Sequence, residues 1–241
     1  MNNDYFHKYS RLFLFVIAPL AGTVFADGNV VDKVYHPYVD ALEKELEYRS
    51  IFQDHKPVNG DEKQLHQLSL GQSIGDNWFA ELNLVGAKNR YGRFDLNAYE
   101  FELKWQLTEQ GEYSADWGML FEYEKKPGQD YQEMVVGVLA EKELGRWSGT
   151  ANLLFIDERG DDTGDEFETA FALQARYRKT RSFEPAVEFY VGQNSMAIGP
   201  AFLGSAIVGI RKTINWEAGV MFGITDVSPD ATLRLLLEFE F

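Results

Sequence analysis

The segment Ala231-Thr-Leu-Arg-Leu-Leu-Leu-Glu-Phe-Glu-Phe241 decides how the rest of the sequence is interpreted. Apolar residues occupy the odd positions from 233 to 241, and polar residues occupy the even positions from 232 to 240 except at Leu236. A period of two places alternate side chains on opposite faces of a β-strand. A soluble sheet with so apolar a last strand would expose an edge prone to aggregation. A strand between lipid and water requires this alternation, so we expect a transmembrane β-barrel.

The first 26 residues have the composition of a secretory signal peptide. Lys8 and Arg11 precede an apolar run from 12 to 25, and Val24-Phe25-Ala26 fits a cleavage site after Ala26. The run is shorter than the roughly 20 residues that a membrane-spanning helix needs. We therefore expect a signal peptide at 1–26, an extended periplasmic tail at 27–40 and an outer-membrane barrel at 41–241.

The composition limits the classes of partner and site. The chain has no cysteine, which excludes a disulfide framework. Removal of residues 1–26 leaves 21 basic and 37 acidic residues, a net charge of −16 that argues against a nucleic-acid partner. A hydrophobic content of 45% with a mean hydropathy of −0.32 suits a barrel, because its lumen and loops dilute the lipid-facing half.

The alternation recurs along the chain and predicts twelve strands, the first four at about 41–53, 64–74, 78–87 and 95–107. An even number places both termini on the periplasmic side. Residues 41–49 also favour a helix by propensity, but their alternation continues through Phe52. The facing of a strand at about 198–211 is not determined, because Gly and Ala are frequent there.

Five tryptophans share the lipid-facing parity and lie near the predicted periplasmic ends of strands. Tryptophan favours the membrane interface, where its ring is apolar and its N–H can contact water. We expect a single periplasmic girdle formed by Trp78, Trp105, Trp117, Trp147 and Trp216.

Acidic residues dominate the inward-facing parity. Such a lumen raises the local concentration of cations, which favours a passive, cation-preferring channel for small solutes. Paired charges could instead fill the lumen, because small barrels are filled by side chains and larger ones enclose channels. The alternative is therefore a structural barrel whose lumen is filled and does not conduct. The predicted lumen-lining residues are Glu43, Glu45, Glu47, Arg49, Glu81, Glu100, Glu102, Lys104, Glu122, Glu124, Glu133, Glu141, Glu168, Arg176, Arg178, Glu188, Glu217, Arg234, Glu238 and Glu240.

One pair of residues suggests an enzymatic alternative. Ser50 and His66 share the lipid-facing parity on the first two predicted strands, and a hairpin centred near Val58 would make them cross-strand neighbours. A hydroxyl beside an imidazole is the minimum for an activated nucleophile, although no third, orienting group is evident. The sequence otherwise lacks a phosphate-binding Gly loop, zinc-ligand spacing and a nucleophile elbow, so we predict no cofactor and no metal site.

Several segments resemble a family of proteobacterial outer-membrane barrels that has no assigned activity. They are Val34-Tyr-His-Pro-Tyr-Val39, Glu45-Leu-Glu-Tyr-Arg49, Asp116-Trp-Gly-Met-Leu-Phe-Glu-Tyr-Glu124, Gly145-Arg-Trp-Ser-Gly-Thr-Ala-Asn152 and the last five residues. More loosely, the chain is similar to outer-membrane transporters of the phenol-degradation MetA-pathway type. The resemblance implies a location in the bacterial outer membrane, with lipid and small solutes as partners. It also implies that Phe239 and Phe241 are an assembly signal for the barrel-assembly machinery.

Overall fold

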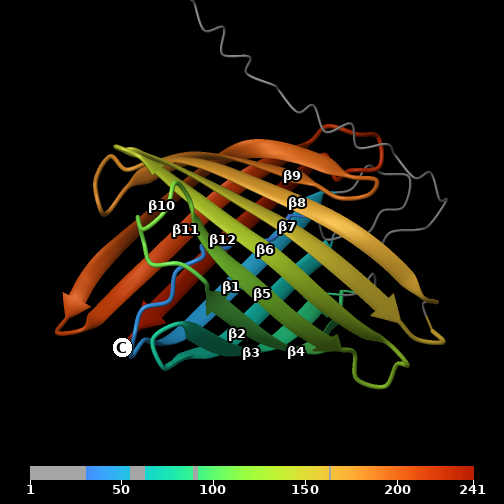
Figure 1. Ribbon diagram of the computed structural model, residues 1–241. Coiled ribbons are helices and arrows are strands. Elements are labelled where there is room, and N and C mark those ends of the chain that lie inside the picture. Colours follow the sequence, from blue (N-terminus) through green and yellow to red (C-terminus); the bar gives the residue numbers. More distant parts are fainter. Residues whose placement is uncertain (1–30, 55–62, 89–91, 163) are drawn as a thin grey trace, which may run out of the picture.

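The computed structural model describes residues 31–54, 63–88, 92–162 and 164–241, so the predicted signal peptide and residues 27–30 lie outside the described part. Twelve antiparallel strands form one closed barrel (Figure 1). No helix in the described ranges is long and apolar enough to cross a membrane. The strands are β1 (Lys44–Asp54), β2 (Lys63–Ile74), β3 (Trp78–Lys88), β4 (Phe94–Gln106), β5 (Asp116–Lys125), β6 (Gln132–Leu144), β7 (Trp147–Arg159), β8 (Glu166–Tyr177), β9 (Glu184–Val191), β10 (Met196–Gly209), β11 (Lys212–Gly223) and β12 (Ala231–Glu240).

Each strand pairs with its neighbours in the sequence, and β12 pairs with β1 to close the barrel. Leu46 lies opposite Phe239 across this closing pair, and the backbone N–H of Phe241 donates to the carbonyl of Lys44 at 2.8 Å. The predicted fold class and the predicted count of twelve strands are confirmed.

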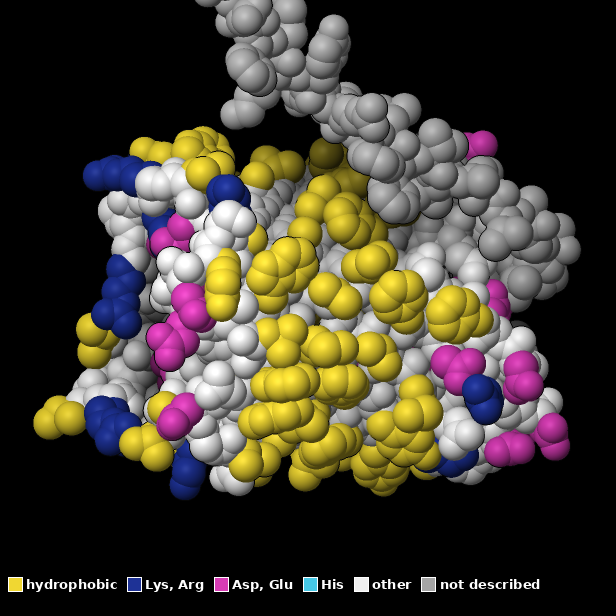
Figure 2. All heavy atoms as spheres, viewed as in Figure 1, with side chains coloured by type: hydrophobic (Ala, Val, Ile, Leu, Met, Phe, Trp, Pro, Cys, Tyr) yellow, Lys and Arg dark blue, Asp and Glu magenta, His cyan; other side chains and the backbone are white. Residues whose placement is uncertain are grey.

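The outer surface of the barrel carries a broad apolar region. Alternate residues of β2, β3 and β12 are large, hydrophobic and exposed, as at Leu70, Leu82 and Leu237. Hydrophobic side chains cover the middle of the visible face, while charged side chains gather towards its two ends (Figure 2). A monomer in water rarely exposes an apolar surface of this extent, whereas a lipid bilayer requires one.

The start of the first strand differs from the expected one for a local reason. A positive φ of 67° at Leu42 turns the chain before β1, so the strand begins at Lys44 and Glu43 precedes it. A β-bulge shifts the register of β3 against β4 between Val85 and Gly86, and β4 begins at Phe94. The ring of Phe94 packs over Gly86, where a Cβ atom would stand 2.2 Å from Phe94 Cζ.

The described part of the expected periplasmic tail lies inside the barrel, which corrects the expectation for residues 31–40. We call residues 31–40 the N-terminal segment. Val31 and Val34 are buried against inward-facing residues of β8 to β11, and Tyr35 is buried against Leu120 and Leu139. Burial in the lumen removes these apolar side chains from water, which an extended periplasmic tail would not do. The segment forms no strand, in keeping with Pro37, which cannot donate to a ladder.

Packing against the N-terminal segment also explains the composition of β10. Ala197, Ala201 and Leu203 face inward and belong to the same buried cluster as Val31 and Val34. Small inward side chains leave room for the segment, because protein interiors are close-packed.

Candidate functional site

One end of the N-terminal segment is bound to strands β1, β9 and β12. The carboxylate of Asp32 accepts a hydrogen bond from Nη1 of Arg49 at 2.5 Å. Its backbone carbonyl accepts hydrogen bonds from Nη1 of Arg234 and from the hydroxyl of Tyr190, the latter at 2.7 Å. Two buried arginines and a buried tyrosine therefore bind a single residue of the segment, which fixes its position in the lumen.

Arg234 is fully buried and its charge is balanced locally. Its Nη2 atom lies 2.9 Å from Oε1 of Glu188 and 3.0 Å from Oε2 of Glu217. Gln174 donates a further hydrogen bond to Glu188 at 2.8 Å. Buried charges are tolerated when they are paired and hydrogen-bonded, so Arg234 offsets much of the negative charge on this side of the lumen.

The middle of the N-terminal segment is bound to the opposite wall. Asn152 of β7 accepts from the backbone N–H of Tyr35 at 2.7 Å and donates to the Tyr35 carbonyl at 2.8 Å. The Tyr35 hydroxyl donates to Oε2 of Glu102 at 3.1 Å. Further along, Nδ1 of His36 lies 2.5 Å from Oε2 of Glu141, and the hydroxyl of Tyr38 donates to Asp116 at 2.8 Å. The segment therefore crosses the lumen between two sets of strands.

Within the described residues, the lumen contains two cavities that the N-terminal segment lines. The loop-side cavity, of about 320 Å³, lies towards the loops that follow odd-numbered strands. The terminus-side cavity, of about 460 Å³, lies towards Glu43 and Glu240, near the start of β1 and the end of β12. Lys33 and Tyr35 line both cavities. The N-terminal segment therefore forms the boundary between them.

The predicted lumen-lining residues occur around these two cavities. All except Glu141, Glu188 and Arg234 line one cavity or the other, and these three are buried in contact with other inward-facing side chains. Asp32 and Lys33 also contribute charges to the lumen, which the alternation did not predict. Residues 31–39 mix apolar, aromatic and charged side chains without alternation, so parity cannot assign them a face.

The charges are distributed unevenly around the lumen. Arg176 and Arg178 lie within 4 Å of Glu141, and Arg234 lies close to two carboxylates. These pairs involve β6, β8, β9, β11 and β12. On β4 and β5, one carboxylate oxygen each of Glu100, Glu102 and Glu122 lies within 4.8 Å of the others. We call the inward residues Glu81, Asn83, Glu100, Glu102, Glu122 and Glu124 the acidic face.

Comparison with solved structures identifies the type of fold. The COG4313 outer membrane channel from Pseudomonas putida F1 has 12% sequence identity and a TM-score of 0.59, over 87% of this chain and 98% of that chain. The KdgM porin in complex with disordered oligogalacturonate has 9% identity and a TM-score of 0.52, over 82% and 98% of the two chains. The NanC porin has 11% identity and a TM-score of 0.50, over 83% and 99%. The chain has the fold of outer-membrane channels.

At these identities the similarity concerns the fold alone. No protein-family model matches the chain, and no curated protein matches it. A fold can support unrelated functions, so the function has to be argued from the lumen itself.

The barrel brings Ser50 and His66 together. They lie directly opposite each other in the β1–β2 pair. The His66 ring also lies among aromatic rings, and its Nδ1 atom is 2.7 Å from the hydroxyl of Tyr48. A Ser–His nucleophile needs the imidazole to accept from the serine and a third group to orient the imidazole. These contacts instead make His66 part of an aromatic cluster on the outer wall of the barrel.

Several of the predicted interface residues are exposed on the outer wall, whereas Trp216 is half-buried and lines the terminus-side cavity. Trp78 and Trp105 are opposite each other and stack with ring centroids 4.8 Å apart. Trp117 and Trp147 are exposed near the first residues of β5 and β7, and Trp216 lies in β11. Phe239 and Phe241 stack on each other at 5.6 Å.

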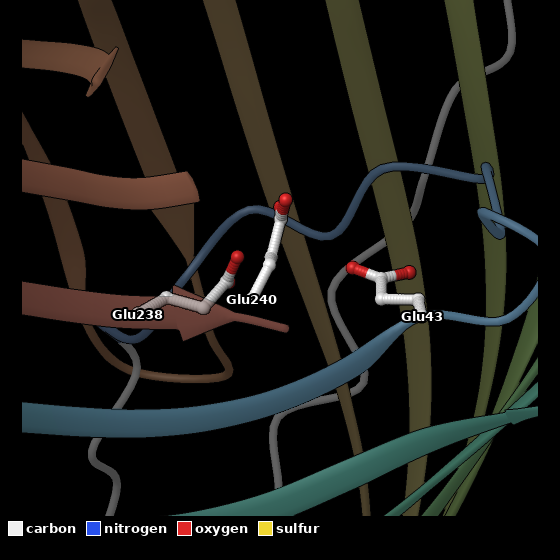
Figure 3. Close-up of side chains that lie close together, drawn as sticks. All are labelled: Glu43, Glu238 and Glu240. Atoms are coloured by element: carbon white, nitrogen blue, oxygen red, sulfur yellow. The ribbon is translucent and has the colours of Figure 1, made fainter. Parts of the chain in front are cut away.

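Within the described residues, three groups of carboxylates place one oxygen from each member within 4.8 Å of one another. The first, Glu43, Glu238 and Glu240, lies where the chain enters β1 and leaves β12 (Figure 3). The second consists of Glu45, Glu47 and Glu238. The third, Glu100, Glu102 and Glu122, belongs to the acidic face. Asn215 donates to both Glu238 and Glu240, so the first group already has hydrogen-bond donors.

A tyrosine in the loop before β6 closes one edge of the loop-side cavity. The hydroxyl of Tyr131 donates to Oε2 of Glu133 at 2.7 Å, and Nζ of Lys126 lies 3.6 Å from the centre of its ring. Burial raises the pKa of the Tyr131 hydroxyl well above its usual value, and the neighbouring carboxylate of Glu133 raises it further. The hydroxyl therefore stays a hydrogen-bond donor over the physiological pH range.

Proposed function

We propose that the protein is an outer-membrane channel that passes small solutes passively and prefers cations, and that the N-terminal segment forms its constriction. The proposal rests on one observation above all: a closed, lipid-compatible barrel contains two cavities that share Lys33 and Tyr35 in their walls. Solutes that enter from either side would have to pass these residues.

Cation preference follows from the imbalance of charge in the lumen. The predicted inward acidic residues outnumber the predicted inward bases by fifteen to five, and several of the arginines are occupied by ion pairs. Confined carboxylates of the acidic face raise the local cation concentration and repel anions. The sequence resemblance to transporters of the phenol-degradation MetA-pathway type is compatible with a channel but assigns no substrate.

A planar-bilayer recording of the purified, refolded protein tests the proposal. Under a salt gradient we expect a reversal potential of the sign that cation flow produces. The preference should decline as salt rises, because the Debye length falls from about 10 Å at 0.1 M to about 3 Å at 1 M. The variant with Glu100, Glu102, Glu122 and Glu124 all changed to Gln should have a reversal potential closer to zero.

The matched control changes Glu109 and Glu112 to Gln, since both are exposed in the β4–β5 turn outside the lumen. This variant should keep the wild-type reversal potential. A wild-type pore that prefers chloride, or a quadruple variant with an unchanged reversal potential, would contradict the assignment of selectivity to the acidic face.

A closed structural barrel is the second candidate, because the N-terminal segment occupies the middle of the lumen. If the barrel is closed, the full chain should give no conductance in the same planar-bilayer recording. Release of fatty acid from phospholipid vesicles without conductance would instead favour a lipid hydrolase that uses Ser50 and His66.

A further inference from the structure

We propose that the lumen binds a divalent cation of the calcium type. The site is formed by Glu100 and Glu102 of β4, Glu122 of β5 and the side-chain amide oxygen of Asn83 of β3. The inference rests on the proposed function only in that the ion reaches the site through the lumen.

The backbone register brings the four residues together. Asn83 lies opposite Glu100 in the β3–β4 pair, and Glu102 lies opposite Glu122 in the β4–β5 pair. One oxygen from each of the three glutamates lies within 4.8 Å of the others. Oxygens that bind one Ca²⁺ ion at about 2.3–2.6 Å can be no farther apart than about twice that distance. The carboxylates are therefore close enough to share an ion without a change of backbone.

Asn83 supplies a separate observation that points to a ligand. Its side chain is almost fully buried, with 2% exposed, and its amide oxygen Oδ1 has no hydrogen-bond partner. Its amide nitrogen donates to Oε1 of Glu100 at 2.5 Å, so the amide group lies beside the carboxylates. Buried acceptors in proteins are nearly always satisfied. A cation bound between the carboxylates would take the amide oxygen as a further ligand.

Of the nearby bases, Lys33 and Arg49 form ion pairs with other acids, while Lys104 lines the terminus-side cavity together with Glu102. Lys33 donates to Glu47, and Arg49 is paired with Asp32 and Glu47. Carboxylates crowded together in a poorly solvated interior need protons or a cation to offset their mutual repulsion. Carboxylate and amide oxygens are the ligands of hard cations such as Ca²⁺, whereas zinc sites use nitrogen and sulfur ligands more often.

The site lies where the two cavities meet. Glu100 and Glu122 line the loop-side cavity, and Glu102 lines the terminus-side cavity. Tyr35, which lines both, donates its hydroxyl to Glu102. An ion held here would occupy the path between the cavities, so it would reduce the conductance of monovalent cations.

Terbium luminescence tests the site without any measurement of transport. Tb³⁺ is a hard cation with oxygen ligands like those of Ca²⁺, and an aromatic residue close to it sensitises its emission. The full chain, treated with EDTA and purified in detergent, should show saturable Tb³⁺ emission on excitation of its aromatic residues. Added Ca²⁺ should displace the Tb³⁺ and abolish this emission.

Three variants locate the binding. Changing Glu100, Glu102 and Glu122 together to Gln should abolish the saturable emission, and Asn83→Ala should weaken the apparent affinity at least tenfold. Changing Glu43, Glu238 and Glu240 together to Gln should leave the affinity unchanged, because this matched cluster lies at the end of the lumen. Heat-modifiable migration on a gel verifies that each variant forms the barrel.

Each outcome decides between the two proposals. Wild-type protein without saturable emission, or emission that survives in the Glu100, Glu102 and Glu122 variant, would overturn the cation site. Emission lost only in the Glu43, Glu238 and Glu240 variant would do the same. Saturable emission from a protein that gives no conductance in EDTA would support the site and overturn the channel.

Discussion

Gly118 of β5 lies directly against Pro37 of the N-terminal segment. A Cβ atom at position 118 would stand 3.0 Å from both Cα and Cβ of Pro37. Gly118 faces the lumen, between Trp117 and Met119 on the outer wall. Any larger residue at 118 would press on the backbone of the segment, so this glycine determines how closely the segment approaches β5.

We therefore predict that Gly118→Val displaces the segment and raises the single-channel conductance, with a smaller effect for Gly118→Ala. The valine side chain cannot be accommodated without movement of Pro37, whereas β5 itself is held by β4 and β6. Gly149→Val is the control, because no atom lies within 4 Å of a Cβ there. Wild-type conductance in a correctly folded Gly118→Val barrel would show that the segment does not limit the pore.

The buried position of Arg234 predicts a large effect on stability. Arg234→Ala would leave Glu188 and Glu217 without their basic partner, and removal of one member of a buried ion pair costs about 3–5 kcal/mol. We expect the free energy of unfolding, measured by urea titration in lipid vesicles, to fall by that amount. Arg159→Ala is the control, because its pair with Asp157 is exposed and such pairs contribute at most about 1 kcal/mol. Equal losses in both variants would contradict the role given to Arg234.

The barrel could be predicted from the sequence because the alternation of apolar and polar residues is a property of each strand by itself. Alternation along β12, from Leu233 to Phe241, assigns each side chain to lipid or lumen without any knowledge of the neighbouring strand. The same signal does not determine the facing of β10. There, inward positions such as Ala201 are small because they pack against Val31 and Val34.

The path of the N-terminal segment could not be predicted in this way. Residues 31–40 show no period, and their contacts with Arg49, Asn152 and Arg234 join positions far apart in the sequence. Parity assigned Arg49 and Arg234 to the lumen but did not identify their partners. The division of the lumen into an ion-paired side and an acidic face follows from those partners, so it required the structure.

Accessibility to a label tests the orientation of the barrel. Asp162 lies in the loop between β7 and β8, and Asp76 lies in the turn between β2 and β3. Connections that follow odd strands and even strands lie at opposite ends of an up-and-down barrel. Since the chain has no cysteine, a single cysteine at Asp162 should react with an impermeant thiol reagent on intact cells, and one at Asp76 should not. Reaction only at position 76 would reverse the orientation.

Phe241 allows a test of assembly that is separate from stability. Its ring stacks on Phe239, and its backbone N–H donates to Lys44 at the seam that closes the barrel. Deletion of Phe241, or Phe241→Asp, should lower the amount of heat-modifiable barrel in the outer membrane of expressing cells, whereas Phe241→Tyr should keep it. If the residue is read by the assembly machinery, the deletion variant should still refold from urea into detergent with the wild-type yield. A matching loss of yield in detergent would show that Phe241 contributes to the seam itself, and normal assembly in cells would remove its role as a signal.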